Sequence, residues 1–131
     1  MQLALQIVYA GNLTKMPFPQ NSTVSTSLIN QLYIVGGWKP KYSKMVHKYN
    51  GVTDKWKRIA DLKKTGYHPC VFLLGNTLYY VSWKQVEKLN IEDSNAAWED
   101  GPSLPHLADL SSCAVLNDIV YVTGNRYHKS S

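Results

Sequence analysis

The stretch Leu32-Tyr33-Ile34-Val35-Gly36-Gly37 recurs twice in altered form, as Leu78-Tyr79-Tyr80-Val81-Ser82-Trp83 and as Val120-Tyr121-Val122-Thr123-Gly124. Each copy is a short apolar run of the kind that forms a buried strand. Trp56 precedes Tyr79 by 23 residues, and Trp98 precedes Tyr121 by the same 23. Equal spacing in two windows indicates one structural unit that is used repeatedly.

Strand signals surround each copy, and no long window keeps the apolar spacing of a helix without interruption by Pro, Gly or Asn. Turn residues separate the runs at regular intervals, and the pair Asn50-Gly51 predicts a turn with positive φ. The predicted strands span 24–29, 32–35, 45–49 and 56–60 in one unit, 70–74, 78–81, 86–89 and the vicinity of Trp98 in the next, and 112–116 and 119–122 in the last.

Units of about 40 to 50 residues with four antiparallel strands are typical of β-propeller blades, of which the WD40 and kelch types are candidates. The Gly-His and Trp-Asp dipeptides of WD40 blades are absent from the sequence. The run Gly36-Gly37, Val46 to Tyr49, Asn50-x-x-Thr53-x-x-Trp56 and Leu62 resembles the kelch repeat. The match is similar to the propeller of Kelch-like (BTB-Kelch) proteins.

This resemblance implies an all-β fold, an incomplete β-propeller of four-stranded antiparallel kelch blades, with about two and a half blades in the chain. Residues 1–9 match no part of the pattern, and 129–131 form a tail. The partial propeller spans 10–128, with a blade end at 10–23, blades at 24–60 and 70–99, and a half blade at 112–128. We expect either a fragment of a Kelch-like protein or a short protein that closes its ring by self-association.

The repeat positions carry large amphipathic side chains and glycines. Tyr and Trp are expected to fill the space between adjacent blades, and a double glycine allows close backbone approach at a strand end. Two and a half blades leave sheet faces bare, so self-association through these faces is expected. The residues assigned these structural roles are Tyr33, Gly36, Gly37, Tyr49, Trp56, Tyr79, Trp98 and Tyr121.

The composition indicates the cellular compartment in which the protein is expected. The chain has 131 residues and only two cysteines, too few for a disulfide framework, and Cys70 and Cys113 are expected to be reduced, buried and inert. No apolar run reaches the length of a membrane-spanning helix, and the apolar start lacks the basic flank of a signal peptide. A cytoplasmic protein without a membrane partner is therefore predicted.

The formal net charge of +5 is concentrated in one region. Between Trp38 and Lys64 only Asp54 and Asp61 oppose nine basic residues. Such a Lys-rich region at 39–64 either attracts an acidic partner, peptide or nucleic acid, or simply solubilises outer strands and loops. The nine basic residues are Lys39, Lys41, Lys44, Lys48, Lys55, Lys57, Arg58, Lys63 and Lys64.

No catalytic, cofactor or metal constellation is visible. The four histidines have no partner at metal-ligand spacing, and neither cysteine has a Cys or His two to four residues away. The acidic pairs Glu92-Asp93 and Glu99-Asp100 fall in turn-rich segments and are interpreted as solvated turn residues. The chain is not expected to be an enzyme.

The resemblance implies a protein–protein interaction module, similar to the part of cullin ubiquitin-ligase adaptors that recognises the substrate. A binder of acidic partners or nucleic acid through the Lys-rich region is the alternative from the charge pattern, with nucleic acid less favoured, and a non-functional truncated fragment is the third. In such propellers the partner contacts loops at one rim, where aromatic anchors dominate binding energy. Packing within or between the blades is the competing role for these aromatics. The partner-binding candidates are Trp38, Lys39, Lys41, Tyr42, Tyr67, His68, Trp83, Lys84, Asp109 and Arg126.

Overall fold

The computed structural model describes residues 24–28, 30–37, 43–66, 69–82, 85–102 and 110–124, which form ten strands and their connections. Sheet A contains β1 (Val24–Leu28), β2 (Gln31–Val35), β3 (Val46–Asn50) and β4 (Lys55–Ile59). Sheet B contains β5 (Cys70–Leu74), β6 (Thr77–Ser82), β7 (Gln85–Asn90) and β8 (Glu99–Asp100). Hairpin C contains β9 (Leu110–Leu116) and β10 (Ile119–Gly124).

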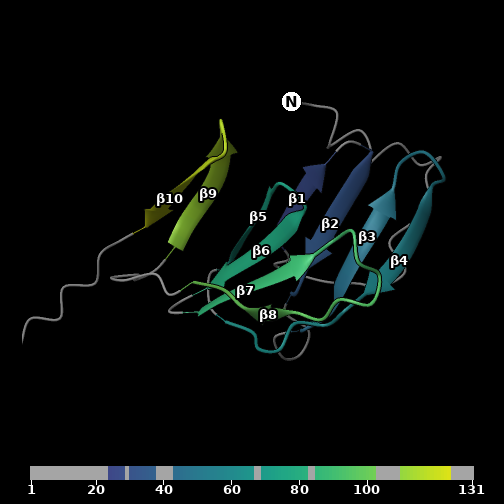
Figure 1. Cartoon of the computed structure of the whole chain (residues 1–131), viewed down its shortest axis with the longest axis horizontal. Helices are drawn as coiled ribbons and strands as arrows, with labels where there is room; N and C mark the ends of the chain where they lie inside the picture. Colours follow the sequence, from purple (N-terminus) through teal and green to yellow (C-terminus); the bar gives the residue numbers. More distant parts are fainter. Residues whose placement is uncertain are drawn as a thin grey trace, which may run out of the picture.

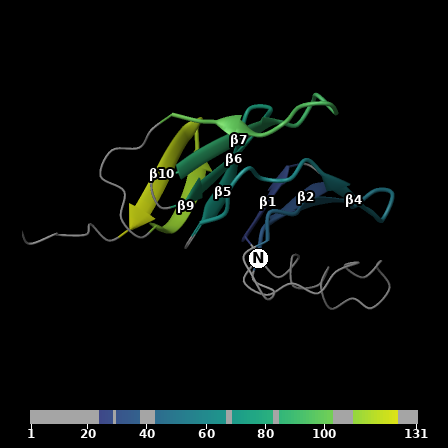
Figure 2. The same cartoon turned by 90° about the horizontal axis from the view of Figure 1, so that it is seen from below.

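Both sheets are antiparallel meanders in which every strand pairs with its neighbours in sequence. Sheet A, sheet B and hairpin C follow one another face to face, and the first strands β1, β5 and β9 lie side by side (Figures 1 and 2). This is the all-β arrangement of successive propeller blades that the repeat predicted. Each predicted strand is present with bounds within two residues of those expected, and Trp98 lies directly before β8.

The turn after β3 differs from the prediction. Gly51 does not adopt the positive φ that the Asn-Gly pair suggested; Asp54, at the end of this four-residue turn, has φ 53°. The Asn50 side chain explains the difference, because its Oδ1 accepts hydrogen bonds from the backbone N–H groups of Val52 (2.9 Å) and Thr53 (3.1 Å). An Asn side chain that binds the backbone ahead of it sets the turn without left-handed geometry at the next residue.

The double glycine that ends β2 has the expected role. Gly36 and Gly37 have φ values of 69° and 127°, a region that side-chain-bearing residues rarely adopt. A Cβ at Gly36 would also lie 3.3 Å from the Ser43 carbonyl oxygen. The backbone therefore leaves sheet A in a conformation that depends on glycine.

The repeated tyrosine occupies one register position in all three units. Tyr33, Tyr79 and Tyr121 each lie in a second strand, opposite Thr26, Phe72 and Ala114 of the preceding strand. Tyr33 is buried between sheets A and B, and Tyr79 stacks on Phe72 with 5.0 Å between ring centroids. Tyr121 is 53% exposed, which fits the bare sheet face expected of a half blade, and its packing against a further blade stays a prediction.

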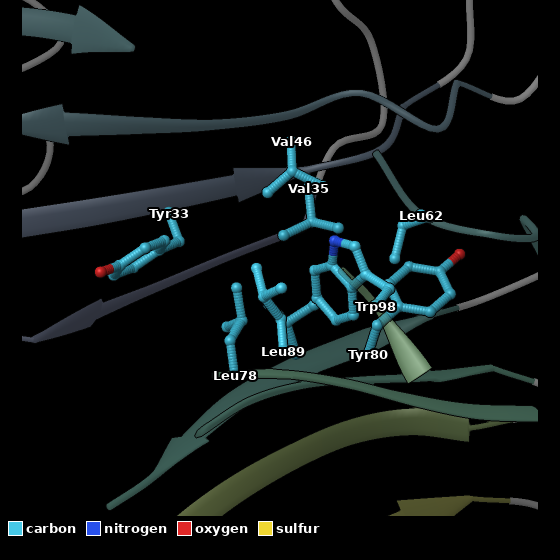
Figure 3. Packing of buried hydrophobic residues seen from close by; sticks show 9 residues of the cluster. Tyr33, Val35, Val46, Leu62, Leu78, Tyr80, Leu89 and Trp98 are labelled. Carbon is cyan, nitrogen blue, oxygen red and sulfur yellow. The ribbon is translucent and has the colours of Figure 1, made fainter. Parts of the chain in front are cut away.

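The core between sheets A and B combines side chains from both (Figure 3). Tyr33, Val35 and Val46 of sheet A meet Leu78, Tyr80, Leu89 and Trp98 of sheet B, together with Leu62 from the connecting segment. Trp98 is buried, and its indole Nε1–H donates to the Ala60 carbonyl oxygen at 2.7 Å. The predicted packing of this tryptophan between blades is confirmed.

Tyr49 and Trp56 form the corresponding aromatic pair within sheet A. They lie opposite each other in β3 and β4, with ring centroids 5.0 Å apart, and Tyr49 is buried. The Tyr49 hydroxyl donates to the Asp54 carboxylate at 2.7 Å, which raises the pKa of Tyr49. Trp56 occupies the register position of Trp98, since Lys57 and Glu99 follow them opposite Lys48 and Lys88.

A smaller core lies between sheet B and hairpin C. Cys70, Phe72, Val81 and Val86 pack there against Cys113 and Val120. Both thiols are free, and the Cys113 Sγ donates to the Val71 carbonyl oxygen at 3.6 Å. The hydrogen bond between the Cys70 thiol and Cys113, together with burial, raises the pKa of Cys70. Cys70 is buried as expected, whereas Cys113 is only half-buried.

The segment that connects sheet A to sheet B is attached to sheet B by a buried carboxylate. Glu87 is 1% exposed and accepts hydrogen bonds from the backbone N–H of Lys63 (2.8 Å), the backbone N–H of Lys64 (3.2 Å) and Gln85 Nε2 (2.8 Å). The Gly66 N–H donates to the Tyr80 hydroxyl oxygen at 3.2 Å. These bonds satisfy the polar groups of a segment that would otherwise lose water on packing.

We expect Glu87→Ala to lower the free energy of unfolding by about 2–4 kcal/mol, because the backbone N–H groups of Lys63 and Lys64 and the Gln85 amide lose the buried carboxylate that accepts from them. Glu99→Ala is the matched control, since Glu99 is an exposed carboxylate of the same sheet and should cost no more than about 0.5 kcal/mol. Urea unfolding followed by circular dichroism measures both variants. Equal effects of the two substitutions would contradict a structural role of the Glu87 carboxylate.

Candidate functional site

The ten partner-binding candidates from the sequence lie outside the described residues. Trp38, Lys39, Lys41 and Tyr42 belong to the connection between β2 and β3, and Tyr67 and His68 to the connection between β4 and β5. Trp83, Lys84, Asp109 and Arg126 lie outside the described residues as well.

A cleft of about 410 Å³ opens between the outer strands of sheet A and the loop that joins β7 to β8 in sheet B. We call it the A/B cleft. Its base is apolar, with the buried Tyr33 and Leu89 and the partly buried Ile59, Ala60, Ile91 and Ala96. The remaining lining residues are Lys48, Lys57 and Arg58 from sheet A, and Asn90, Glu92, Asp93, Ser94 and Asn95 from sheet B.

The sheet A side of the cleft is basic. Lys48 of β3 lies directly opposite Lys57 of β4, and Tyr33 of β2 lies opposite Lys48 on the other side. The three side chains thus form one row across the sheet. Among the described residues the ion pairs are Arg58–Asp61 at 2.9 Å and Lys63–Asp100 at 2.8 Å, and neither includes Lys48 or Lys57.

The same register position in sheet B has a different charge pattern. Lys88 occupies there the position of Lys48, because it lies opposite Tyr79 as Lys48 lies opposite Tyr33. Its partner on the outer strand is Glu99, whereas Lys48 faces Lys57. Opposite charges stabilise such a cross-strand pair and like charges destabilise it. The like-charged pair of sheet A is therefore not a requirement of the fold.

The sheet B side of the cleft is acidic and well ordered by its own hydrogen bonds. Asn90 Oδ1 accepts from the Glu92 N–H (3.0 Å), and Asp93 Oδ1 accepts from the Asn95 N–H (2.9 Å). The Ile91 N–H also donates to the Asn76 carbonyl oxygen at 3.0 Å. Glu92 and Asp93 are exposed turn residues, as predicted. Their position in one cleft with Lys48 and Lys57 was not predicted.

Two ion pairs flank the connection between the sheets. The Arg58 guanidinium contacts the Asp61 carboxylate through both Nε and Nη2, which raises the pKa of Arg58. Lys63 Nζ binds Asp100 Oδ1, and this contact lowers the pKa of Asp100. Both pairs are exposed to solvent, so their energetic contribution is small. Because Arg58 is paired with Asp61, Lys48 and Lys57 are the basic side chains of the A/B cleft outside an ion pair among the described residues.

Within the described ranges, no three His, Cys, Asp or Glu side chains are grouped so that they could hold a metal ion. No described helix is long and apolar enough to cross a membrane. The chemistry that the A/B cleft offers is therefore charge and apolar contact from fixed strands and one ordered loop.

Comparison with known proteins supports the architecture. The Kelch motif matches residues 23–63, which include all of sheet A and the start of the connecting segment. Matches are found to 92 solved chains. The solved structure of YjhT superimposes with a TM-score of 0.67 at 20% sequence identity, covering 86% of this chain and 36% of that one. The chain has a kelch-repeat fold. No curated protein sequence matches it.

The chain thus spans about a third of the length of YjhT, and the likeness concerns the kelch fold alone. Sequence reasoning missed the A/B cleft. A signal was present, since Lys48 and Lys57 stand in the third and fourth strands of one kelch unit where the next unit has Lys88 and Glu99. Recognising it required the strand register, which brings the two lysines face to face.

We predict that Lys57→Glu raises the thermal midpoint by about 1–5 °C at low salt, since it replaces a like-charged cross-strand pair by an opposite-charged one. The mirror variant Glu99→Lys should lower it by a similar amount, because it places a lysine opposite Lys88. Both shifts should shrink at 1 M salt. Thermal unfolding at two ionic strengths measures them, and a lower midpoint for Lys57→Glu would show that the repulsion is absent.

Proposed function

We propose that the protein is a protein-interaction module with a kelch-type propeller fold. The observation that carries this proposal is the Kelch motif at 23–63, whose sheet packs on the next one through a fixed junction and leaves a cleft of mixed charge. A rigid scaffold of this kind lowers the entropy lost when its surface binds a partner. Loops and clefts on such scaffolds are where binding residues concentrate.

The resemblance of Gly36-Gly37, Asn50, Thr53 and Trp56 to Kelch-like proteins extends the proposal. We infer a role like that of the substrate-recognition part of cullin ubiquitin-ligase adaptors, in which the module selects the protein to be modified. The proposed setting is the cytoplasm. Support comes from the free thiols of Cys70 and Cys113, which face one common core without forming a disulfide.

The aromatic residues between β2 and β3 are the first to test. We expect Trp38→Ala with Tyr42→Ala to weaken binding of a protein partner at least about tenfold, since aromatic anchors dominate interface energy. Val52→Ser is the control, because Val52 is 73% exposed in the turn at the other end of β3 and its loss should not matter.

The partner is first identified by affinity capture on the full chain with mass spectrometry and then titrated as a purified protein by calorimetry. A saturable interaction that the double variant weakens and the control retains supports the module. If captured proteins show no saturable binding when purified, the interaction function is wrong. If removing this chain from cells leaves ubiquitylation of the partner unchanged, the adaptor role is wrong, whereas the interaction function is not affected.

Self-association is proposed as a property of the exposed surface of hairpin C. Leu116, Ile119 and Tyr121 are 60%, 55% and 53% exposed. The tyrosines at the same register position as Tyr121 pack against an adjoining sheet or hairpin in the two other units. A large apolar surface of this kind favours burial against another copy of the chain.

We predict that Ile119→Ser with Tyr121→Ser shifts the mass measured by light scattering toward the monomer, because two exposed apolar side chains become polar. Val52→Ser again serves as the control, since it removes an exposed apolar side chain from sheet A. A wild-type chain that stays monomeric as its concentration is raised would contradict the prediction.

A further inference from the structure

We propose that the A/B cleft binds an extended protein segment that carries one acidic and one basic side chain with an apolar side chain between them. The acidic group lies between Lys48 and Lys57, and the basic group lies against Glu92 and Asp93. The proposal rests on the proposed function and names the chemistry of the segment recognised. It concerns the surface between sheets A and B.

The lysine pair is the first argument. Lys48 and Lys57 lie directly opposite each other, and neither takes part in the two ion pairs among the described residues. The kelch unit that follows places Glu99 where Lys57 stands, so the fold accepts the favourable combination. A ligand carboxylate between two ammonium groups removes the repulsion and gains two charge-assisted contacts. The pair is therefore best explained by an anionic group that binds there.

The acidic loop is the second argument, and it decides the class of partner. The lining has three basic residues, of which Arg58 is already paired with Asp61, against the two acidic residues Glu92 and Asp93. A polyanion such as a nucleic acid would place phosphates against both carboxylates, and like charges brought together at an interface cost affinity. A peptide that alternates in charge meets both sides of the cleft favourably.

The apolar base is the third argument. Ile59 and Ala60 of sheet A and Ile91 and Ala96 of sheet B are partly buried hydrophobics packed on the main core. All four line the cleft together with its basic and acidic residues and offer contact to one aliphatic side chain. The volume of about 410 Å³ falls near the lower end of ligand pockets, roughly 300–1,000 Å³, and suits a short segment rather than a folded domain.

The site is also held in place before binding. Trp98 Nε1–H donates to the Ala60 carbonyl oxygen, and Glu87 binds the backbone of Lys63 and Lys64, so partly buried hydrogen bonds join the two sheets beside the cleft. The loop that carries Glu92 and Asp93 is ordered by Asn90 and by its own backbone. Binding then requires ordering of the peptide alone, which limits the entropic cost.

The first experiment selects binders from a displayed library of random dodecapeptides on the full-length chain. We expect enrichment of sequences with an acidic, an apolar and a basic side chain in close succession. The enriched peptide is then synthesised and titrated by calorimetry against wild type, Lys57→Gln and Lys88→Gln. Lys88 is the matched control, because it has the same register position in sheet B and does not line the cleft.

The decisive measurement is a double-mutant cycle between Lys57 and the acidic residue of the peptide. Lys57→Gln should weaken binding about tenfold, and Lys88→Gln should leave it unchanged. Replacing the acidic residue of the peptide by glutamine should weaken binding to wild type and have little further effect on Lys57→Gln. Additive losses, or equal losses for Lys57→Gln and Lys88→Gln, would overturn the proposal.

Two further outcomes separate the sources of failure. If a single-stranded oligonucleotide or a hexaglutamate peptide binds more tightly than the selected peptide at 150 mM salt, the cleft is a general anion surface and the proposal is wrong. If selected peptides bind but respond to Trp38→Ala and not to Lys57→Gln, the proposed function stands and the A/B cleft is not the site. If neither a peptide nor a purified protein binds saturably, the proposed function and the proposal for the A/B cleft are both wrong.

Discussion

The carboxylate of Glu87 is the constraint on which the arrangement of sheets A and B depends. It is buried in β7 of sheet B and accepts hydrogen bonds from three donors. Two of them, the backbone N–H groups of Lys63 and Lys64, belong to the connecting segment, and the third, Gln85 Nε2, comes from the same strand. A buried charge without such partners would be strongly unfavourable. The two backbone donors therefore have to stay where they are, and they belong to the segment that leads out of sheet A. One side chain thus fixes where the first sheet ends relative to the second.

The A/B cleft is a consequence of this junction. Trp98 reaches across to the Ala60 carbonyl and fills the space near the connection, while β8 is only two residues long and leaves the 91–98 segment free to form its own turns. Sheet A instead has a five-residue outer strand. Among the described residues, Lys48 and Lys57 of sheet A form no ion pair with Glu92 or Asp93, although all four line the same cleft.

The sequence predicted the fold well but did not predict the A/B cleft, for physical reasons that differ. Strand positions follow from alternating burial and from turn residues, which are local signals, so runs such as 70–74 were located without error. The turn at Asn50 was misjudged because a side-chain hydrogen bond overrode the usual conformation of Asn-Gly. Exposure of Tyr121 depends on what packs against hairpin C, which no local pattern reports.

The A/B cleft depends on relations between strands. The sequence indicated Lys48 and Lys57 only as members of a Lys-rich region, because their pairing appears only in the strand register. Equivalent positions of the two sheets show how one kelch framework supports different surfaces. His47 and Glu87 occupy the same buried position, and burial lowers the pKa of His47 whereas Glu87 binds the connecting segment. Lys57 and Glu99 likewise share an outer position with opposite charge. The hydrogen-bonded register is common to both units, and the surfaces of the two sheets differ through the few positions at which the side chains differ.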